Sequence, residues 1–438
     1  MKYNIVIPEI IDQIAEEIKK QCGKIYIVGG YIRDCILNIE SKDIDFEIFG
    51  LKMEKAENIL AKFGKVKKVG ETFPILLMGN YEFSIIEEEF SLERVKKEAE
   101  RRDFTINALY FDVENKTLFD FVNAETSFEK KVLLPVSERI MKEDPVRILR
   151  AAQIALRIGF EISDEIKIIA KNDFKLLITV PKERIFIEIE KILMKCQRPS
   201  QAFIWLKEIG WLELFYPELV ILEKVEQGIK FHPEGDAFIH TMLAIDALPI
   251  EERELDIMFA LLFHDVGKAI VKNIREDDTV HFYGHDEAGA AMVEVLMRRI
   301  TDNKKLIESV EKLIRYHMYP LKFLKEITPK SIKKISIKVD FPKLMKVHYA
   351  DMNGKGKSYC RYEHIDKAME IYKAVKNEIR PIISGKMLIS IGIEPGENMG
   401  MILKELYEMQ LDEQFITAED GIEIAKNLLK RKEEQCQK

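Results

Sequence analysis

The chain has 438 residues, of which 47% are hydrophobic and 33% charged, and its net charge is −7. This length exceeds one small core, so we expect about two to four domains of ordinary globular composition. No apolar run reaches the roughly 20 residues that span a bilayer, and the first residues lack a signal-peptide pattern. The five cysteines show no paired spacing. Composition therefore predicts a soluble cytoplasmic protein with no membrane partner, and it excludes a cysteine-ligated metal.

Short apolar runs alternate with short helices over the first 135 residues, which is typical of a modest sheet covered by helices. The expected strands are 25–28, 44–49, 75–78, 83–86 and 108–112. From about residue 136 helical periodicity dominates, and the clearest expected helices are 145–158, 182–194, 201–209 and 255–263. The predicted fold class is therefore α+β, with a small mixed sheet first and helical segments after it. Expected boundaries lie near residues 135, 230 and 380.

The first chemical motif joins two glycines, an arginine and two aspartates. Gly29 and Gly30 end a strand and carry no Cβ, so the backbone can close on an anion. Arg33 follows in the opening turn of the next helix, where free N–H groups favour phosphate. Asp43 and Asp45 alternate with apolar residues, so both carboxylates point to one face of a strand. Paired carboxylates beside a phosphate cradle suit two Mg²⁺ ions and indicate nucleotidyl transfer.

Three more polar motifs follow in order. The string from Arg101 to Asn107 sets two guanidinium groups beside an acid and an amide, which suit phosphate oxygens and ribose hydroxyls. Asp144, Arg147 and Arg150 share one helical face at spacings of three. The string 181–185 then opens another helix. Each motif alone is more often a salt-bridged surface, but their order behind the glycine and aspartate pairs favours one shared site.

These strings resemble the class II tRNA nucleotidyltransferases, which are the CCA-adding enzymes and related bacterial poly(A) polymerases. The ordered motifs lie between about residues 20 and 220. The resemblance implies a nucleotidyltransferase palm over 1–135 and a helical neck and body over 136–230. It implies that Asp43 and Asp45 hold Mg²⁺ and are catalytic. The residues to which it assigns nucleotide binding are Gly29, Gly30, Arg33, Arg102, Asp103, Asn107, Asp144, Arg147 and Arg150.

Asp144 and Arg147 together predict which bases the site accepts. A carboxylate beside a guanidinium presents an acceptor and a donor, which match the amine and ring nitrogen of cytosine and of adenine. Uracil and guanine present the reverse pattern, and a buried mismatch of this kind is rejected strongly. We therefore expect CTP and ATP as substrates, with UTP and GTP excluded.

Several positions depart from the family pattern. The segment between Ile86 and Arg101 is short and reads as one charged helix, whereas the family has a flexible loop that helps the site switch from C to A. Gln153 stands where a further arginine is expected. Ile86 and Glu87 replace the Pro-Arg pair that usually ends this strand in the family. A CC-adding-only enzyme, an A-adding-only enzyme and a poly(A) polymerase therefore stay open. Glu82 is the candidate third catalytic acid, and an exposed edge-strand glutamate is the alternative.

A second group of ligands lies in the C-terminal half. His264 and Asp265 are adjacent at the end of an apolar run, and burying this pair is costly without a metal or a strong partner. Neutral imidazole with carboxylate suits Mn²⁺, Fe²⁺, Co²⁺, Ni²⁺ or Zn²⁺. The candidate ligands are His240, His264, Asp265, His285, His317 and Asp351.

This pattern resembles the HD phosphohydrolases, a helical superfamily with the signature His…His-Asp…Asp, and its local strings are similar to CCA-adding enzymes with a fused HD domain. The resemblance implies a helical HD domain over 231–380 and a helical tail over 381–438. It implies hydrolysis of phosphomonoesters and 2′,3′-cyclic phosphates, with a metal that activates water and Lys268 to steady the phosphate. An HD fold that no longer catalyses is the alternative.

Both resemblances together predict an enzyme that adds CCA to tRNA 3′ ends without a nucleic-acid template and also repairs RNA 3′ ends. Its partners would be tRNA, CTP and ATP, with Mg²⁺ in the first site and a transition metal in the second. The sequence leaves a homodimer open. The non-enzyme alternative is an RNA-binding protein with relic sites, which intact Asp43, Asp45, His264 and Asp265 argue against.

Overall fold

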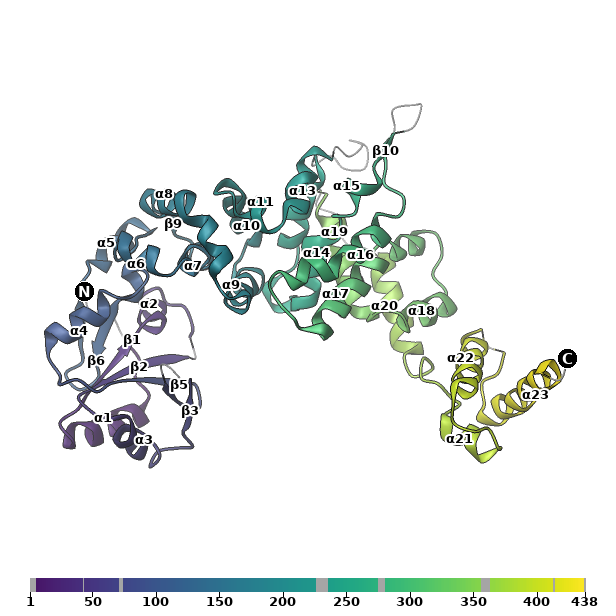
Figure 1. Cartoon of the computed structure of the whole chain (residues 1–438), viewed down its shortest axis with the longest axis horizontal. Coiled ribbons are helices and arrows are strands. Elements are labelled where there is room, and N and C mark those ends of the chain that lie inside the picture. The colour runs from purple at the N-terminus through teal and green to yellow at the C-terminus, as the bar shows by residue number, and fades with distance from the viewer. Residues whose placement is uncertain are drawn as a thin grey trace. The chain divides into compact units, whose positions relative to one another are not determined.

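The chain folds as two compact units, Met1–Phe215 and Tyr216–Lys438, in the computed structural model. The structure describes residues 5–41, 43–70, 74–225, 235–274, 280–355, 363–412 and 414–436 (Figure 1). The boundary expected near residue 230 lies outside the described residues, so the division into four segments stays a prediction. No helix in the described ranges combines the length and apolar character that crossing a bilayer requires.

A seven-stranded mixed sheet lies at the centre of the first unit (Figure 1). Its strands in spatial order are β3 (Lys67–Val69), β4 (Ile75–Met78), β5 (Tyr81–Ile86), β2 (Ile44–Phe49), β1 (Lys24–Val28), β6 (Leu109–Asp112) and β7 (Thr117–Asp120). Only β2 and β5 pair in parallel. The five predicted strands are confirmed, whereas β3 and β7 are absent from the prediction because they are short and carry polar, mostly exposed residues.

Helices cover the two faces of this sheet differently. The helices α1 (Glu9–Lys20), α2 (Gly30–Ile36) and α3 (Met53–Leu60) pack on one face over an aliphatic and aromatic core. In α1 the buried residues Ile11, Ile14, Ala15 and Ile18 follow helical spacing. The other face meets α4 (Leu92–Ala99), the single charged helix expected before Arg101. This second face also carries the acidic residues of β2.

The rest of the first unit is mostly helical. Its helices are α5 (Ala124–Lys130), α6 (Glu138–Glu143), α7 (Val146–Ile158), α8 (Asp164–Asp173), α9 (Lys182–Lys195), α10 (Pro199–Glu208) and α11 (Trp211–Phe215). The predicted helices near α7, α9 and α10 are confirmed, and α7 packs on both others. The prediction of a purely helical neck and body over 136–230 is wrong in one detail, because β9 (Glu161–Ile162) lies within it. This strand pairs in parallel with β8 (Val132–Leu133).

The second unit is built around α14 (Leu255–Phe263), which is buried from Asp256 onward. It packs against α13 (Ala237–Asp246), α17 (Lys304–Tyr316) and α19 (Phe341–Asn353). The other helices are α12 (Pro217–Val220), α15 (Lys268–Val271), α16 (His285–Arg298), α18 (Pro329–Ser336) and α20 (Glu363–Val375). The tail helices α21 (Gly385–Ser390), α22 (Glu397–Leu411) and α23 (Ala418–Cys436) share a small core of their own. Within the described residues of this unit, the antiparallel pair β10 (Asn273–Ile274) and β11 (Val280–His281) departs from the helical prediction.

Short 3₁₀ turns complete the described elements. They are η1 (Thr105–Asn107), η2 (Phe174–Thr179), η3 (Ile221–Lys224), η4 (Ile250–Glu252) and η5 (Tyr319–Leu324).

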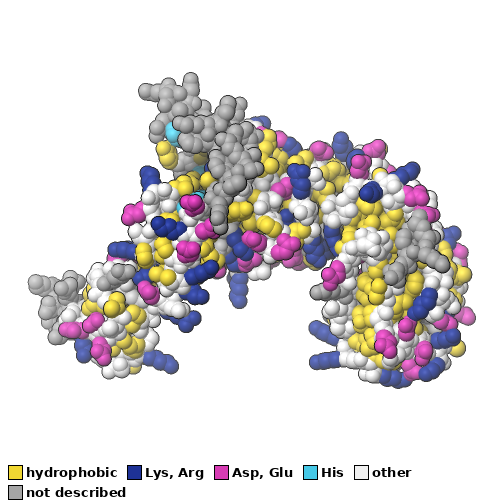
Figure 2. Space-filling view, turned by 180° about the vertical axis from the view of Figure 1, so that it is seen from behind, with side chains coloured by type: hydrophobic (Ala, Val, Ile, Leu, Met, Phe, Trp, Pro, Cys, Tyr) yellow, Lys and Arg dark blue, Asp and Glu magenta, His cyan; other side chains and the backbone are white. Residues whose placement is uncertain are grey.

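Surface charge is mixed rather than gathered. On the side shown in Figure 2, Lys and Arg side chains are interspersed with Asp and Glu. The lysine-rich run 322–346 follows this pattern, because Lys330 and Lys334 both pair with Asp412, and Lys343 pairs with Asp256. These contacts favour an ion-paired helical surface over a dedicated nucleic-acid patch.

Candidate active sites

The sheet brings the three predicted catalytic acids onto one face. Asp45 on β2 lies directly opposite Glu82 on β5. Asp43 lies just before β2, and its charge helps to raise the pKa of the Asp45 carboxyl, which burial raises most. β5 lies between β2 and β4, so the edge-strand alternative for Glu82 is wrong. Burial raises the pKa of the Glu82 carboxyl, and the charge of Asp45 raises it further. Three like charges on one face are unfavourable alone, and oxygen ligands of this kind fit Mg²⁺.

Gly29 forms the turn between β1 and α2 beside these acids. Its backbone has φ 75° and ψ −144°, a region that essentially only glycine adopts. A Cβ at this position would lie 3.0 Å from Oδ2 of Asp45 and 3.2 Å from Nη1 of Arg102. Gly30 begins α2, and a Cβ there would meet the guanidinium of Arg33 at 3.1 Å. Gly29 is therefore required by its backbone conformation beside the acids, whereas at Gly30 only the Arg33 side chain would have to shift.

Arg33, which the family resemblance assigns to nucleotide binding, is engaged in contacts within the protein. Its side chain is buried, and its guanidinium donates to Oδ1 of Asp34 at 2.6 and 2.8 Å and to Oδ1 of Asn107 at 2.8 Å. Asp34 also pairs with Arg157 from α7 at 3.0 Å. In the free chain Arg33 thus fixes α2 against η1, and direct contact with a triphosphate would require these bonds to break.

Arg102 lies against a carboxylate that the sequence reading overlooked. Its Nη2 lies 2.6 Å from Oε1 of Glu47, and the Tyr110 hydroxyl donates to Oε2 of Glu47 at 2.6 Å. Glu47 shares the face of Asp45 two residues further along β2, so extending the alternation of the aspartate pair would have found it. Arg102 keeps part of its side chain exposed beside Gly29, where it can meet an anion.

Asp103 is the centre of a buried polar network. Arg150 donates to Oδ2 of Asp103 at 2.7 and 2.6 Å, and Asn107 donates to Oδ1 at 3.0 Å. Burial would raise the pKa of Asp103, but the charge of Arg150 and these hydrogen bonds hold it below its ordinary value. Asp103 therefore stays ionised and ties α7 to the segment before η1, while Arg150 remains about one-third exposed at 34%.

The two residues predicted to read the base take different partners. Oδ2 of Asp144 accepts from Nη2 of Arg184 at 2.6 Å, and Arg184 comes from α9. Arg147 donates to the carbonyl oxygens of Ile140 at 2.5 Å and Arg101 at 3.5 Å. The prediction that these two side chains read the base stays a prediction, and the structure adds Arg184 of the neighbouring helix as a partner of Asp144.

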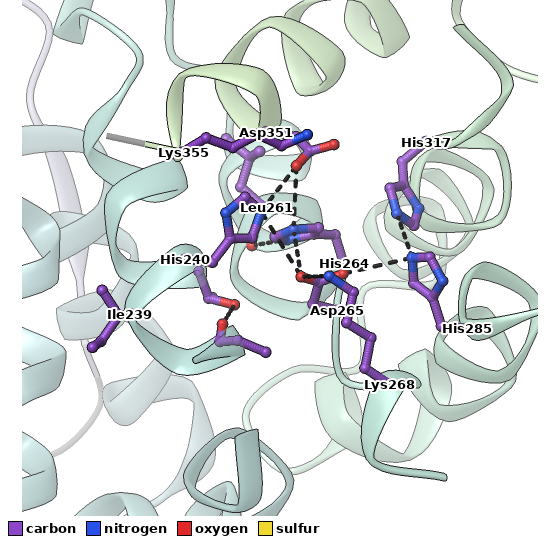
Figure 3. A network of polar contacts seen from close by, with 12 residues as sticks. Ile239, His240, Leu261, His264, Asp265, Lys268, His285, His317, Asp351 and Lys355 are labelled. Atoms are coloured by element: carbon purple, nitrogen blue, oxygen red, sulfur yellow. Dashed lines mark hydrogen bonds and ion pairs between the residues drawn. The ribbon is translucent and has the colours of Figure 1, made fainter. Parts of the chain in front are cut away.

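In the second unit, four predicted ligands converge from three helices (Figure 3). Nε2 of His240 lies 2.9 Å from Oδ1 of Asp351 and 3.8 Å from Oδ2 of Asp265. Nε2 of His264 lies 3.3 Å from the same Asp265 oxygen and 3.9 Å from Asp351. Ligand atoms of His240, His264 and Asp265 lie within 4.8 Å of one another, as in a metal site.

Asp265 also belongs to a second ligand trio. Its Oδ1 faces Nε2 of His285 at 3.6 Å, and Nε2 of His317 lies 3.1 Å from Nε2 of His285. These three ligand atoms again lie within 4.8 Å of one another. One carboxylate shared by two histidine pairs is an arrangement that fits two adjacent cations.

The tautomers of these histidines test whether a metal fits. Three of them place Nδ1 against a backbone carbonyl three residues earlier, namely His264 at 2.8 Å, His285 at 2.8 Å and His317 at 2.6 Å. A carbonyl only accepts, so each Nδ1 carries the proton. Burial lowers the pKa of His285 and lowers that of His317 to about 3, so both rings are neutral. Two bare Nε2 lone pairs then face each other, which a cation between them would stabilise.

Lys268 holds the shared carboxylate rather than standing free in the pocket. Its Nζ donates to Oδ2 of Asp265 at 2.6 Å, and the lysine is only 5% exposed. Burial would raise the pKa of Asp265, but His264 and Lys268 hold it well below its ordinary value. A cavity of about 210 Å³ opens beside these ligands, and Lys355, a residue without a sequence motif, lines it together with Tyr283.

The fold and the two clusters define the class of this protein: a sheet-based nucleotidyltransferase head joined to a helical domain with a phosphohydrolase-type metal centre. Within the described residues only the second unit gathers three ligand atoms within 4.8 Å of one another.

Comparisons with known proteins agree with that class. The family described as "Poly A polymerase head domain" matches residues 25–87 and 78–134, "Probable RNA and SrmB- binding site of polymerase A" matches 159–222, and "HD domain" matches 231–339. The "Multifunctional CCA protein" of Pasteurella multocida (strain Pm70) is 30% identical over 400 residues, which cover 82% of this chain and 91% of that protein. The namesake of Mannheimia succiniciproducens is also 30% identical, with the same shares covered. The chain belongs to the multifunctional CCA protein family.

Solved structures share the fold. The CCA-adding enzyme of Bacillus stearothermophilus in complex with CTP has a TM-score of 0.68 at 18% identity, covering 98% of this chain and 100% of that one. A CCA-adding enzyme with ATP has a TM-score of 0.62 at 21% identity, covering 97% and 96%. The Thermotoga maritima enzyme complexed with tRNA has a TM-score of 0.57 at 20% identity, covering 97% of each chain. The predicted fold class is confirmed.

Proposed function

We propose that one site in the first unit adds C and A to tRNA 3′ ends from CTP and ATP, without a nucleic-acid template. The observation that carries the proposal is the convergence of Asp43, Asp45 and Glu82 on one sheet face beside the Gly29 turn, in a chain of this family. Relatives named multifunctional CCA proteins support the complete CCA reaction over the CC-only, A-only and poly(A) alternatives.

The residues divide the work of nucleotidyl transfer. Mg²⁺ held by Asp43 and Asp45 would neutralise charge as the tRNA 3′-hydroxyl displaces pyrophosphate. The Gly29 turn gives the triphosphate close access to backbone N–H groups. Arg102 and Arg150 are partly exposed while they pair with Glu47 and Asp103, and they would offer their remaining donors to the phosphates.

Base choice is the finer part of the proposal. Asp144 and Arg147 offer the acceptor and donor that cytosine and adenine match, and Arg184 orients the Asp144 carboxylate through their 2.6 Å contact. We expect CMP and AMP incorporation to exceed UMP incorporation by at least about a hundredfold at equal nucleotide concentrations. Undiminished UMP incorporation would sink this assignment.

Direct assay separates the complete reaction from its partial forms. Transcripts of tRNA ending before, within and after CCA are supplied with labelled CTP and ATP. The proposal expects two C additions followed by one A, and no extension of the complete end. Extension that stops after CC would indicate a CC-adding-only enzyme. Incorporation of A only into a CC-ended acceptor would indicate an A-adding-only enzyme. This experiment is informative because the short helix α4 occupies the place of the family's flexible loop, which helps the site switch from C to A.

The second unit is proposed to hydrolyse phosphomonoester and 2′,3′-cyclic phosphate ends of RNA. Its nitrogen and oxygen donors fit a transition metal such as Mn²⁺, Co²⁺, Ni²⁺, Fe²⁺ or Zn²⁺. The test removes metal with a chelator and restores single ions while hydrolysis of 2′,3′-cyclic AMP is followed. No hydrolysis with any of these ions would leave an HD fold that does not catalyse.

One variant distinguishes an enzyme from an RNA-binding protein with relic sites. Loss of nucleotide addition in Asp45→Ala, with tRNA binding retained, supports an enzyme; unchanged addition contradicts it. We further propose a cytoplasmic location and tRNA as the macromolecular partner, and sedimentation of the full chain distinguishes a monomer from a homodimer.

A further inference from the structure

The second unit presents two lysines to its metal-ligand pocket, and they differ in what they already bind. Lys268 is the one that sequence resemblance assigns to the phosphate. Its ammonium lies 2.6 Å from Oδ2 of Asp265, the carboxylate shared by both ligand trios. Lys268 is also nearly fully buried and lies over the ring of Phe282 at 5.6 Å. Its position is therefore set by Asp265.

Lys355 is in a different situation. It lines the same cavity from just beyond the C-terminal end of α19, four residues after Asp351 in the chain. Among the residues that the structure describes, its Nζ has no ion-pair partner, and its one polar contact is the thioether of Met352 at 3.7 Å. Figure 3 shows Lys355 reaching the cluster from the Asp351 side, while Lys268 reaches Asp265 from the other.

The backbone fixes Lys355 at the pocket. Gly354 ends α19, and a Cβ there would lie 3.1 Å from both the Cβ and the backbone N of Ala244 in α13. The end of α19 is thus packed directly on the helix that carries His240. Burial acts to raise the pKa of the Asp351 carboxyl, but His240 holds it well below its ordinary value. The charges of His264 and Lys355 lower it further.

We infer that Lys355 binds the phosphoryl oxygens of the substrate, and that Lys268 is a positioning residue for Asp265. The inference rests on the proposed phosphohydrolase function and deepens it. A phosphate dianion entering this cavity would meet the carboxylates of Asp265 and Asp351, and cations are needed to offset that repulsion. Two lysines line the cavity, and Lys268 already pairs with Asp265. Within the described residues, the ammonium of Lys355 has no such ion pair with a carboxylate.

Equilibrium binding of inorganic phosphate to the Mn²⁺-loaded full-length protein tests the assignment without relying on turnover. Calorimetry compares wild type with Lys355→Met, Lys355→Arg and Lys268→Met. Lys355→Met should weaken phosphate binding by about tenfold or more, because one charge-assisted contact is lost. Lys355→Arg should remain within about threefold of wild type, since it keeps the charge. Lys305→Met, an exposed lysine of α17, controls for net charge.

Lys268→Met should instead lower the Mn²⁺ bound per chain and leave phosphate affinity within about threefold in the molecules that retain metal. The inference is overturned if Lys355→Met binds phosphate like wild type, or if Lys268→Met weakens binding more than Lys355→Met does at equal metal content.

Hydrolysis of a 2′-nucleoside monophosphate separates this inference from the proposed function. Lys355→Met should raise KM more than it lowers kcat, whereas a merely structural change would also shift the unfolding midpoint. An unchanged KM with normal turnover overturns the role of Lys355. Absence of turnover in wild type, with Lys355-dependent phosphate binding intact, overturns the proposed hydrolase function and supports the binding role.

Discussion

Three of the four arginines predicted to contact nucleotide lie against carboxylates, and the fourth, Arg147, donates to backbone carbonyls. The pairs are Arg33 with Asp34, Arg102 with Glu47, and Arg150 with Asp103. A guanidinium has five donors, so one edge can hold a carboxylate while another meets phosphate. At the scale of single residues these pairs hold the guanidinium groups in place, and Arg33 is the pair member whose own side chain is buried.

Replacing Glu47 by glutamine should shift the pH dependence of CMP incorporation. Burial raises the pKa of Asp45, and Asp43 and Glu47 raise it further against the opposing charge of Arg102. A protonated carboxyl does not hold Mg²⁺, so activity at limiting Mg²⁺ falls as pH falls through this raised pKa. Without the charge of Glu47 the pKa of Asp45 drops, which moves the fall to lower pH. Rates from about pH 5 to about pH 8 check this; a fall at the same or higher pH contradicts it.

Glu82→Gln tests the third acid. We expect CMP incorporation to drop on the order of a hundredfold, because the ligand opposite Asp45 loses its charge. The matched control is Glu89→Gln, an exposed glutamate just beyond β5, which should keep full activity. Initial rates at saturating CTP give the comparison. Equal rates in both variants would remove Glu82 from the catalytic group.

At the scale of elements, glycines decide how closely helices and strands approach the two sites. Gly29 lets β1 turn into α2 beside Asp45, and Gly267 lets the turn after α14 approach the start of α16. Both positions act through backbone shape rather than through a side chain.

Gly29→Ala should abolish nucleotide addition and cost about 1–3 kcal/mol of unfolding free energy, because its backbone conformation suits only glycine. The matched control is Gly159→Ala at the end of α7, which also has positive φ, 73°, but no atom within 4 Å of the added Cβ. This control should lose about 1–2 kcal/mol while keeping its activity. Urea unfolding and CMP incorporation are measured for both; a fully active Gly29→Ala would refute the packing argument.

Gly267→Ala should separate the two halves of the metal cluster. An added Cβ would lie 2.1 Å from the carbonyl oxygen of His285 and 2.6 Å from the backbone N of Gly289, so α16 must move. We expect less bound Mn²⁺ per chain and a loss of about 1–3 kcal/mol of unfolding free energy. Gly400→Ala in α22 of the tail has open space around its Cβ and no left-handed φ, so it serves as the control. Unchanged metal content in Gly267→Ala would contradict this geometry.

At the scale of the whole molecule, each compact unit carries one site with its own chemistry. A nucleotidyl transferase needs a free 3′-hydroxyl, and a phosphohydrolase acting on RNA ends can generate one. The proposed activities are thus consecutive steps on damaged tRNA.

This order can be tested with tRNA that ends in a 2′,3′-cyclic phosphate. Wild-type protein should remove the phosphate and then add nucleotides, whereas Asp265→Asn should extend only tRNA with a normal 3′-hydroxyl. Labelled CTP incorporation on both substrates gives the result. Extension of the cyclic-phosphate substrate by Asp265→Asn, with no other phosphatase present, would show that the second unit is not needed for repair.

The sequence by itself determined the parts of this protein that follow from local pattern. Strands β1, β2, β4, β5 and β6 follow from apolar runs. Helix α14 follows from a mostly apolar segment of nine residues that precedes His264. The ligand identities of both sites also come from motifs, because their chemistry depends on residue type and order.

Only the tertiary structure decided which charges meet. Arg184 reaches Asp144 from 40 residues away, and Glu47 meets Arg102 across 55 residues. The sharing of Asp265 by two histidine pairs likewise needs α13, α14, α16 and α17 to pack together. An ion pair depends on a separation of a few ångströms, which packing of distant elements sets and local sequence pattern does not encode.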